Sequence, residues 1–239
     1  MTTKKLILIL VILIAIVGLI LVVKKGTPAI SKDVRIEEAT TTYSIDVDIA
    51  RTGNTALDAS VEAYARAQAR EFGEMYAPTM FTEEEMTLLG FADGRTYELV
   101  VKGNPWNFKT LSGMTVEVYT FTGGAHGSTI YVPFIVNENG IPVTLADLFS
   151  SNTAYLDRLS EAVQPLLKKQ LEENQMYDEM FFEAGTTASE GNFFVDEISN
   201  KGITFIFQQY QVAAYVAGTP RVTVSLETLA DILNPAYFE

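Results

Sequence analysis

The sequence predicts an α+β fold in which antiparallel β-sheet packs with two long helices, preceded by one N-terminal transmembrane helix. The 239 residues are 48% hydrophobic and 20% charged, which is typical of a folded globular protein. Apolar residues recur at helical spacing over two long stretches and alternate with polar residues over many short ones. The short stretches follow one another across turn residues, which favours antiparallel pairing over a doubly wound parallel sheet.

An uninterrupted apolar run covers residues 6–23, and as a helix it would measure about 27 Å, close to the thickness of a hydrocarbon core. The run is longer than the apolar region of about 7–15 residues in a secretory signal, and Lys24 and Lys25 follow it directly. We therefore expect an uncleaved signal anchor, with a cleaved signal as the alternative. Residues 1–5 are then a cytoplasmic tail and residues 24–40 a juxtamembrane linker. Because so little chain precedes the run, we expect a single-pass cell-membrane protein whose C-terminal domain is extracytoplasmic.

The first half of the folded part, residues 41–136, opens with an alternating strand at 43–49. A helix is expected from Thr55 to about Met75, and Thr55 with Asp58 resembles a capping box at its start. The other elements expected here are a helical turn at 82–89, strands at 97–102, 106–111, 114–121 and 129–136, and turns at 104–105 and 111–113.

The second half, residues 137–239, holds the other long helix. That helix covers residues 152–174, and Pro165 inside it predicts a kink or two abutting helices. The elements expected after it are a loop at 179–192, a hairpin of strands at 193–198 and 203–207, a last strand at 221–225, and a short helix at 226–233 capped by Ser225. Neither half shows a complete two-layer set of its own, so we expect the two halves to share one sheet.

The only histidine, His126, lies in a glycine cluster between two predicted strands. Gly123 and Gly124 precede it, and glycines let the backbone adopt positive φ and approach a neighbour closely. Histidine titrates near neutral pH, so His126 could act as a general base or as a ligand. The alternative is that His126 caps or hydrogen-bonds a loop between strands.

An aromatic signature lies near the C-terminus and reads Phe205-x-Phe207-x-x-Tyr210-x-Val212-Ala213-x-Tyr215-x-x-Gly218. Tyr210 and Tyr215 each combine apolar area with a hydroxyl, which suits a surface that binds sugar or protein. The alternative is that these aromatic residues pack in the core as strand residues.

Three stretches together carry a family resemblance: Gly-Gly-Ala-His at 123–126, Thr-Leu-Ala-Asp-Leu-Phe at 144–149, and the aromatic signature with the strand after it. They resemble the paired extracellular domains of unknown function found in the lysozyme-sensing anti-sigma factor RsiV and in the peptidoglycan deacetylase PdaC. The resemblance covers residues 41–233 and implies an outward-facing module that contacts lysozyme-like hydrolases or peptidoglycan. Because only a short tail precedes the apolar run and the chain ends at Glu239, we expect neither the sigma-binding nor the catalytic domain of those relatives. The candidate binding residues are Gly123, Gly124, His126, Tyr210, Tyr215 and Gly218.

The charge of the chain narrows the class of partner. The formal net charge is −13, and without Lys4, Lys5, Lys24 and Lys25 beside the apolar run the rest carries about −17. Without these four lysines, 13 of the 17 basic residues stand against 30 acidic ones, so the domain is a poor binder of polyanions, and we expect no nucleic-acid partner. A basic protein such as lysozyme is compatible through electrostatic steering, whereas the alternative is that the charge serves solubility alone.

The sequence assigns no catalytic residue, no metal site and no cofactor. The chain has no cysteine, which excludes disulfides, thiolate metal sites and a cysteine nucleophile. It contains no His-Glu-x-x-His spacing and no Gly-x-Ser-x-Gly elbow. Asp46 and Asp48 share one strand face, where two carboxylates could pair as ligands, and we interpret them instead as solvated side chains.

The leading hypothesis is a non-enzymatic, membrane-anchored, extracytoplasmic binding module of the bacterial cell envelope. The first alternative is a cell-wall hydrolase or deacetylase that uses His126 and nearby acids. The second alternative is a subunit of an envelope complex that binds another protein.

Overall fold

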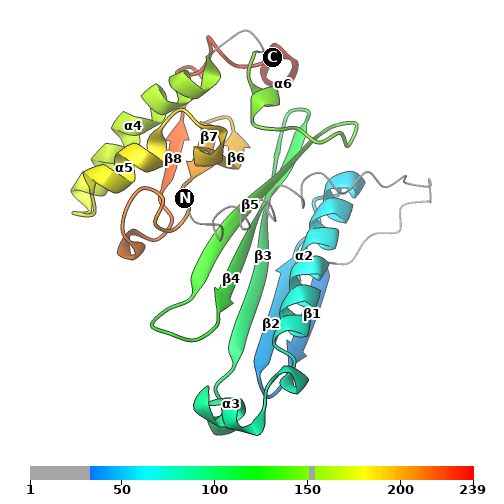
Figure 1. Ribbon diagram of the computed structural model, residues 1–239. Coiled ribbons are helices and arrows are strands. Elements are labelled where there is room, and N and C mark those ends of the chain that lie inside the picture. The colour runs from blue at the N-terminus through cyan, green and yellow to red at the C-terminus, as the bar shows by residue number, and fades with distance from the viewer. Residues whose placement is uncertain (1–32, 151–153) are drawn as a thin grey trace. The chain divides into compact units, whose positions relative to one another are not determined.

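The strands form two separate sheets in the computed structural model, which describes residues 33–150 and 154–239 (Figure 1). The first sheet has the order β1-β2-β3-β4-β5 and the second the order β6-β7-β8. The strands are β1 (Val34–Ala39), β2 (Tyr43–Ile49), β3 (Tyr97–Phe108), β4 (Leu111–Phe121), β5 (Ser128–Asn137), β6 (Phe194–Ser199), β7 (Gly202–Ile206) and β8 (Arg221–Val224). The helices are α2 (Thr55–Met75), α3 (Glu83–Leu88), α4 (Tyr155–Glu173), α5 (Glu179–Thr186) and α6 (Pro235–Phe238).

The predicted α+β class with two long helices is confirmed, and the sheets are mostly antiparallel. One pair differs, because β2 and β3 run parallel and α2 connects them. A parallel pair needs a crossover connection of this kind, whereas the antiparallel pairs are joined by short turns or loops.

The expectation that the two halves share one sheet is wrong. Helix α2 packs on the first sheet, and α4 packs on the second. Each sheet therefore has a helical layer of its own, which completes a two-layer arrangement in each half. The sequence pattern did not reveal this because β1 was not recognised and the second sheet is small.

Strand β1 lies in the region predicted as a linker, residues 24–40, which the structure describes from Asp33 onward. It pairs antiparallel with β2. Only Val34 and Ile36 alternate with polar residues before acids follow, so the period-two signal is short. The predicted transmembrane anchor at 6–23 and the tail before it lie outside the described residues. Within the described ranges, no helix is both long and apolar enough to cross a membrane.

The turn predicted at 104–105 is wrong, because β3 continues without interruption to Phe108. The pairing of β2 with β3 ends at Gly103, so Pro105 lies where no described strand borders this edge of β3. A proline is tolerated there because no ladder hydrogen bond needs its N–H. The turn predicted at 111–113 is wrong as well. Gly113 lies inside β4, where the Trp106 ring occupies the space that a Cβ would need, with the nearest ring atom at 2.1 Å.

The long helices begin and continue in ways that differ in detail from the predictions. The N-cap of α2 is Asn54 rather than Thr55, since its side chain accepts hydrogen bonds from Ala56 and Leu57 N–H. Asp58 instead accepts from Thr52 and Gly53. Helix α4 runs as one helix through Pro165, so two abutting helices do not form.

Three smaller differences concern the second half. The loop predicted at 179–192 contains α5, which begins at the N-cap Asp178. Residues 226–232 form turns rather than a helix, although Ser225 Oγ does accept a hydrogen bond from Thr228 N–H at 3.1 Å. Helix α6 follows them and was not predicted.

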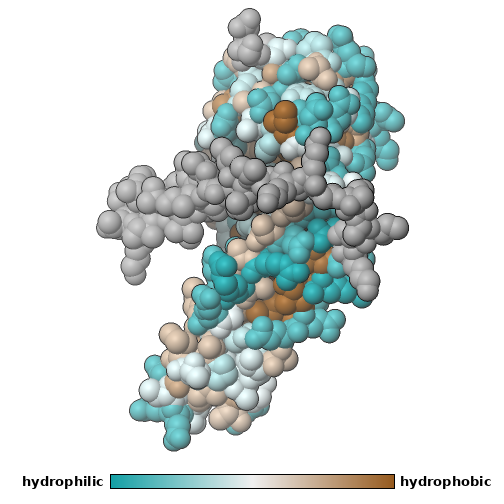
Figure 2. Space-filling view, turned by 90° about the vertical axis from the view of Figure 1, so that its right-hand side faces the viewer, coloured by the Kyte–Doolittle hydropathy of each residue, from teal (hydrophilic) through white to brown (hydrophobic). Residues whose placement is uncertain are grey.

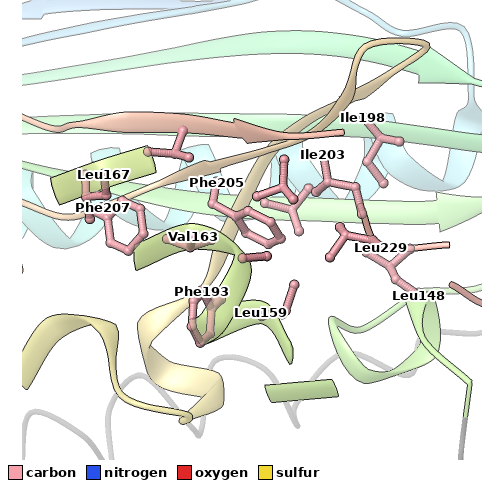
Figure 3. Close-up of a cluster of buried hydrophobic side chains, with 14 of the residues drawn as sticks. Leu148, Leu159, Val163, Leu167, Phe193, Ile198, Ile203, Phe205, Phe207 and Leu229 are labelled. Carbon is pink, nitrogen blue, oxygen red and sulfur yellow. The ribbon is translucent and has the colours of Figure 1, made fainter. Parts of the chain in front are cut away.

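Two hydrophobic clusters hold the chain together. The smaller one joins α2 to the first sheet and includes Val47, Leu57 and Val116, each 0% exposed. The larger one joins α4 to the second sheet, and Figure 3 shows the side chains of Phe205, Phe207 and their neighbours gathered there. It also takes in Trp106, Phe108, Leu111 and Ile135 from the first sheet. The larger core therefore spans both sheets and fixes the second against the first.

Candidate functional site

Two loops that are far apart in the sequence meet at one place. The loop between β4 and β5 carries His126, and the loop between β7 and β8 carries Tyr210 and Tyr215. The rings of His126 and Tyr215 stack with centroids 3.7 Å apart and planes inclined by 18°. The Tyr210 hydroxyl lies 3.4 Å from His126 Nε2, and the Tyr210 and Tyr215 ring centroids are 5.7 Å apart. We call these three side chains the aromatic cluster.

The first loop depends on its glycines. Gly123 and Gly124 have φ of 89° and 92°, a region that favours glycine strongly. Gly127 follows His126, and a Cβ there would lie 2.3 Å from the Tyr119 ring. The glycines thus shape the loop and let it lie against β4, which places His126 beside the second loop.

The hydrogen bonds of His126 define its tautomer when the ring is neutral. His126 Nδ1 lies 3.0 Å from the carbonyl oxygen of Gly127, which can only accept. Nδ1 therefore carries the proton, and Nε2 is left as an acceptor for the Tyr210 hydroxyl. Among the described residues these two groups are the hydrogen-bond partners of His126, so a carboxylate does not orient the ring.

Buried residues of the second loop anchor it to the larger core. Val212 and Ala213 are 0% and 3% exposed and belong to the larger core. Gln211 Nε2 donates to the backbone carbonyls of Gly185 at 3.0 Å and Asn192 at 2.9 Å. Its Oε1 accepts from the N–H of Gln208 at 2.9 Å. These contacts fix the backbone conformation of the loop.

Two further glutamines join the loop to the first sheet. Gln209 Oε1 accepts from the Thr129 N–H at 2.9 Å. Gln208 bonds both backbone groups of Tyr131, accepting from its N–H at 2.9 Å and donating to its carbonyl at 2.8 Å. These bonds satisfy the outer edge of β5 and set the distance between the two loops.

Tyr210 has an unusual backbone. Its φ is 63°, in the left-handed region, where a bulky side chain is rare. Such a conformation costs about 1–3 kcal/mol and persists only where the surroundings impose it. Here the bonds of Gln208 and Gln211 on either side impose it, and the result is that the Tyr210 ring points outward beside His126.

The aromatic cluster is accessible from outside. His126 is exposed, Tyr210 is 49% exposed, and Tyr215 is half-buried because His126 covers one face of its ring. Val216, next to it, is 74% exposed. Among the described residues, no group of three or more His, Cys, Asp or Glu side chains could hold a metal ion. The arrangement offers ring faces, one imidazole and two hydroxyls to a partner, and these groups suit binding.

The structure sorts the candidate residues by role. His126, Tyr210 and Tyr215 come together, whereas Gly123 and Gly124 shape the first loop. Gly218 directly follows the short 3-10 turn Tyr215–Ala217 of the second loop, with φ 65° and ψ −127°. Phe205 and Phe207 are fully buried, so the aromatic signature divides into core residues and surface residues. Sequence reasoning missed Gln208, Gln209 and Gln211, although three glutamines directly after a buried strand are a visible signal.

Comparison with known proteins finds a family model that is similar to part of the second half. Residues 146–227 match the family model of DUF3298. It is described as a protein of unknown function. The residues that match DUF3298 include Tyr210, Tyr215 and Gly218, while His126 lies outside them. The aromatic cluster therefore joins the region similar to DUF3298 with a loop of the preceding sheet.

Two solved structures of DUF3298 family proteins share the fold. One, from Bacteroides fragilis, is 18% identical, with a TM-score of 0.56, over 85% of this chain and 92% of that chain. The other, from Pseudomonas aeruginosa, is 16% identical, with a TM-score of 0.55, over 87% of this chain and 96% of that chain. At these identities the likeness concerns the fold alone. No curated protein matches the sequence.

Proposed function

We propose that this protein is a non-enzymatic binding module of the bacterial cell envelope, and that the aromatic cluster is its binding surface. The observation that carries the proposal is the assembly of three accessible rings from two loops 84 residues apart. Partly buried glutamine contacts hold one loop, glycines shape the other, and Tyr210 keeps a strained backbone. Strain of this kind clusters at functional sites.

The partner that fits best is a basic protein of the lysozyme type. Tyr side chains near the centre of an interface supply much of its binding energy, and the exposed Tyr210 and Val216 offer that area. The net charge of −13 attracts a basic partner over longer distances. Peptidoglycan is the second candidate, favoured by the ring faces, on which the apolar face of a sugar can stack.

The proposal includes the membrane anchor at residues 6–23, with the folded part outside the cell. Its basis is the apolar run and the lysines at both ends of it. Protease treatment of intact cells that carry the protein tests it. We expect digestion of the folded part without lysis, and protection until lysis would contradict the orientation.

A hydrolase or deacetylase fits the geometry less well. His126 Nε2 is occupied by the Tyr210 hydroxyl, and among the described residues the hydrogen-bond partners of the ring include no carboxylate to orient it as a general base. Replacement of His126 by Gln tests this alternative against muropeptides. Turnover by the parent that the variant loses would establish the enzyme and end the proposal.

Binding of the full chain to lysozyme across a salt series tests the leading proposal. We expect binding that survives physiological salt, with Tyr210→Ala and Tyr215→Ala each weakening it at least about tenfold, the effect of a central interface residue. Met180→Ala, at a 73% exposed position on α5, is the control and should bind as the parent does. If modest salt abolishes binding equally in all variants, the binding is only non-specific attraction between an acidic and a basic protein. Selective binding of muropeptides would instead assign the surface to peptidoglycan.

A further inference from the structure

Strand β1 forms one edge of the first sheet, and no other described strand covers its outer side. It stands at the end of the strand order, and among the described residues β2 is the only strand beside it. The Thr40 N–H donates to the Tyr43 carbonyl, and this bond sets which β1 residues bond to β2. Because bonding alternates in an antiparallel pair, Arg35, Glu37 and Ala39 direct their N–H and C=O groups outward. Such a row of groups is a template for another strand.

The outward residues carry opposite charges. Val34 and Ile36 pack toward the cluster under α2, so Arg35 and Glu37 project from the other face of the sheet. Arg35 lies opposite Asp48 and forms an ion pair with it at 3.4 Å. Glu37 lies opposite Asp46, and both are exposed. Like charges directly opposite each other destabilise a strand pair. A positive charge placed on the other side of Glu37 would therefore be favourable.

The other face of β1 borders a groove. The groove lies between β1 and α2, has a volume of about 620 Å³, and is lined by Ile36, Glu38, Ala69, Gly73 and others. On this face of the molecule, Figure 2 shows hydrophobic surface bordered by hydrophilic surface. An added strand would direct alternate side chains into this groove.

We propose that β1 pairs antiparallel with β1 of a second copy of this chain, on a two-fold axis through Ile36. In this register Arg35 of each copy lies opposite Glu37 of the other, so two opposite-charge pairs form. Ile36 lies opposite Ile36 beside the two grooves. The partner's guanidinium also relieves the repulsion between Glu37 and Asp46. The two five-stranded sheets then continue into one, and the uncovered edges disappear.

Charge selects this register over its neighbours. An axis through Glu37 sets Glu37 opposite Glu37, and an axis through Arg35 sets Arg35 opposite Arg35. A shift by a single residue would pair outward groups with inward ones and would reverse the faces of the side chains. Among two-fold registers near the centre of the strand, the axis through Ile36 is therefore the one with complementary charges.

Charge reversal in the full chain, held in detergent micelles and followed by sedimentation over a concentration series, tests the proposal. Glu37→Arg faces Arg35 of the other copy, and we expect the half-dimer concentration to rise at least about tenfold. Arg35→Glu should do the same. The double variant exchanges the two charges, and its half-dimer concentration should return to within about threefold of the parent's. All variants share the same N-terminal segment, so association through that segment cannot mimic this pattern.

A single cysteine tests the register itself, because the chain contains none. Ile36 pairs with itself as a non-hydrogen-bonded pair, where Cα atoms lie about 4.5 Å apart, within the range of a disulfide. Ile36→Cys should therefore form a covalent dimer on mild oxidation. Ala39→Cys is the control, since the two copies of that residue would lie about 20 Å apart along the strands. A parent that stays monomeric at all concentrations, or a dimer that Glu37→Arg leaves intact, or cross-linking at both positions alike, would overturn the proposal.

Discussion

The two edge strands of the first sheet, β5 and β1, differ in how many of their outer backbone groups are hydrogen-bonded by other described segments. At β5, other segments bond alternate residues of the strand: Gln209 at Thr129, Gln208 at Tyr131, and the Val143 N–H at Ile135. Pro133, between them, has no N–H to leave unpaired. At β1, the described residues supply no comparable cover. The covered edge fixes the loops of the aromatic cluster, whereas the uncovered edge leaves a strand available to a second copy.

The chemistry of the two sides differs as well. Neutral amide groups hold the β5 edge, and these do not titrate. On the side of β1, the Arg51 guanidinium bonds Glu62 of α2 at 2.5 Å, and Arg66 bonds it at 2.8 Å. The side-chain hydrogen bonds from Arg51 and Arg66 lower the pKa of Glu62 below its usual value near 4.5. We therefore expect the stability of the β5 edge to depend on its amide side chains, and the stability contributed by Glu62 to depend on pH.

Removal of the cover at β5 should have the largest effect. Gln208→Ala leaves the Tyr131 N–H and carbonyl without their partner, and we expect the free energy of unfolding to fall by about 2–3 kcal/mol. Urea denaturation measures the loss, and hydrogen exchange at Tyr131 should accelerate. Gln170→Ala on α4 is the control and should change stability by less than about 0.5 kcal/mol. If both variants behave alike, the amide contacts do not hold the edge.

Acid should weaken the contact that Glu62 makes with Arg51 and Arg66. A depressed carboxyl pKa adds stability that is present above the pKa of the unfolded chain and is lost as pH falls through the folded-state pKa. Glu62→Gln should therefore cost about 1 kcal/mol at neutral pH and flatten the decline of stability below about pH 4.5. Glu138→Gln, in an exposed turn, should keep the parent's profile. A Glu62→Gln profile that still follows the parent's would place the acid response elsewhere.

A third test concerns the strained backbone of Tyr210, in the loop that covers the β5 edge. Glycine accepts the φ of 63° at position 210, so Tyr210→Gly should leave stability within about 0.5 kcal/mol of the parent while it removes a ring from the binding surface. Tyr215→Ala should cost about 1 kcal/mol, because it ends the stacking on His126. Thermal unfolding measures both. A larger loss for Tyr210→Gly than for Tyr215→Ala would mean that the Tyr210 ring stabilises the fold rather than serving a partner.

The smallest effect is expected at the uncovered edge. Glu37→Gln removes the repulsion from Asp46 and should stabilise the dilute monomer by a few tenths of a kcal/mol at low salt. The gain should disappear at high salt. Glu98→Gln is the matched control, since Glu98 lies on the same face but opposite Ser44. Equal gains for the two variants would show a general effect of net charge instead of a cross-strand pair.

Much of the local structure was predictable from short-range pattern. The helix from Thr55 to Met75, the hairpin before Phe207 and the last strand are set by periodicity and turn residues. Errors arose where tertiary context overrode local signals. Pro105 signals a turn in isolation but lies on an unpaired edge of β3, and Gly113 signals a turn but makes room for Trp106.

The candidate site was predictable in its members but not in its assembly. His126 was notable as the only histidine in a glycine-rich loop, and Tyr210 and Tyr215 as part of an aromatic signature. That Phe205 and Phe207 are buried while the two tyrosines surround a histidine depends on contacts across 84 residues. Local periodicity carries no information on such contacts.

The sequence by itself determined the α+β class, the two long helices, the acidic charge and the unusual loops, because these depend on composition and on neighbours a few residues away. Only the tertiary structure decided that the strands divide into two sheets, that glutamines cover one edge and not the other, and that His126 stacks on Tyr215. The physical reason is that edge pairing and ring stacking join segments distant in the chain, and burial of the shared core sets which segments meet.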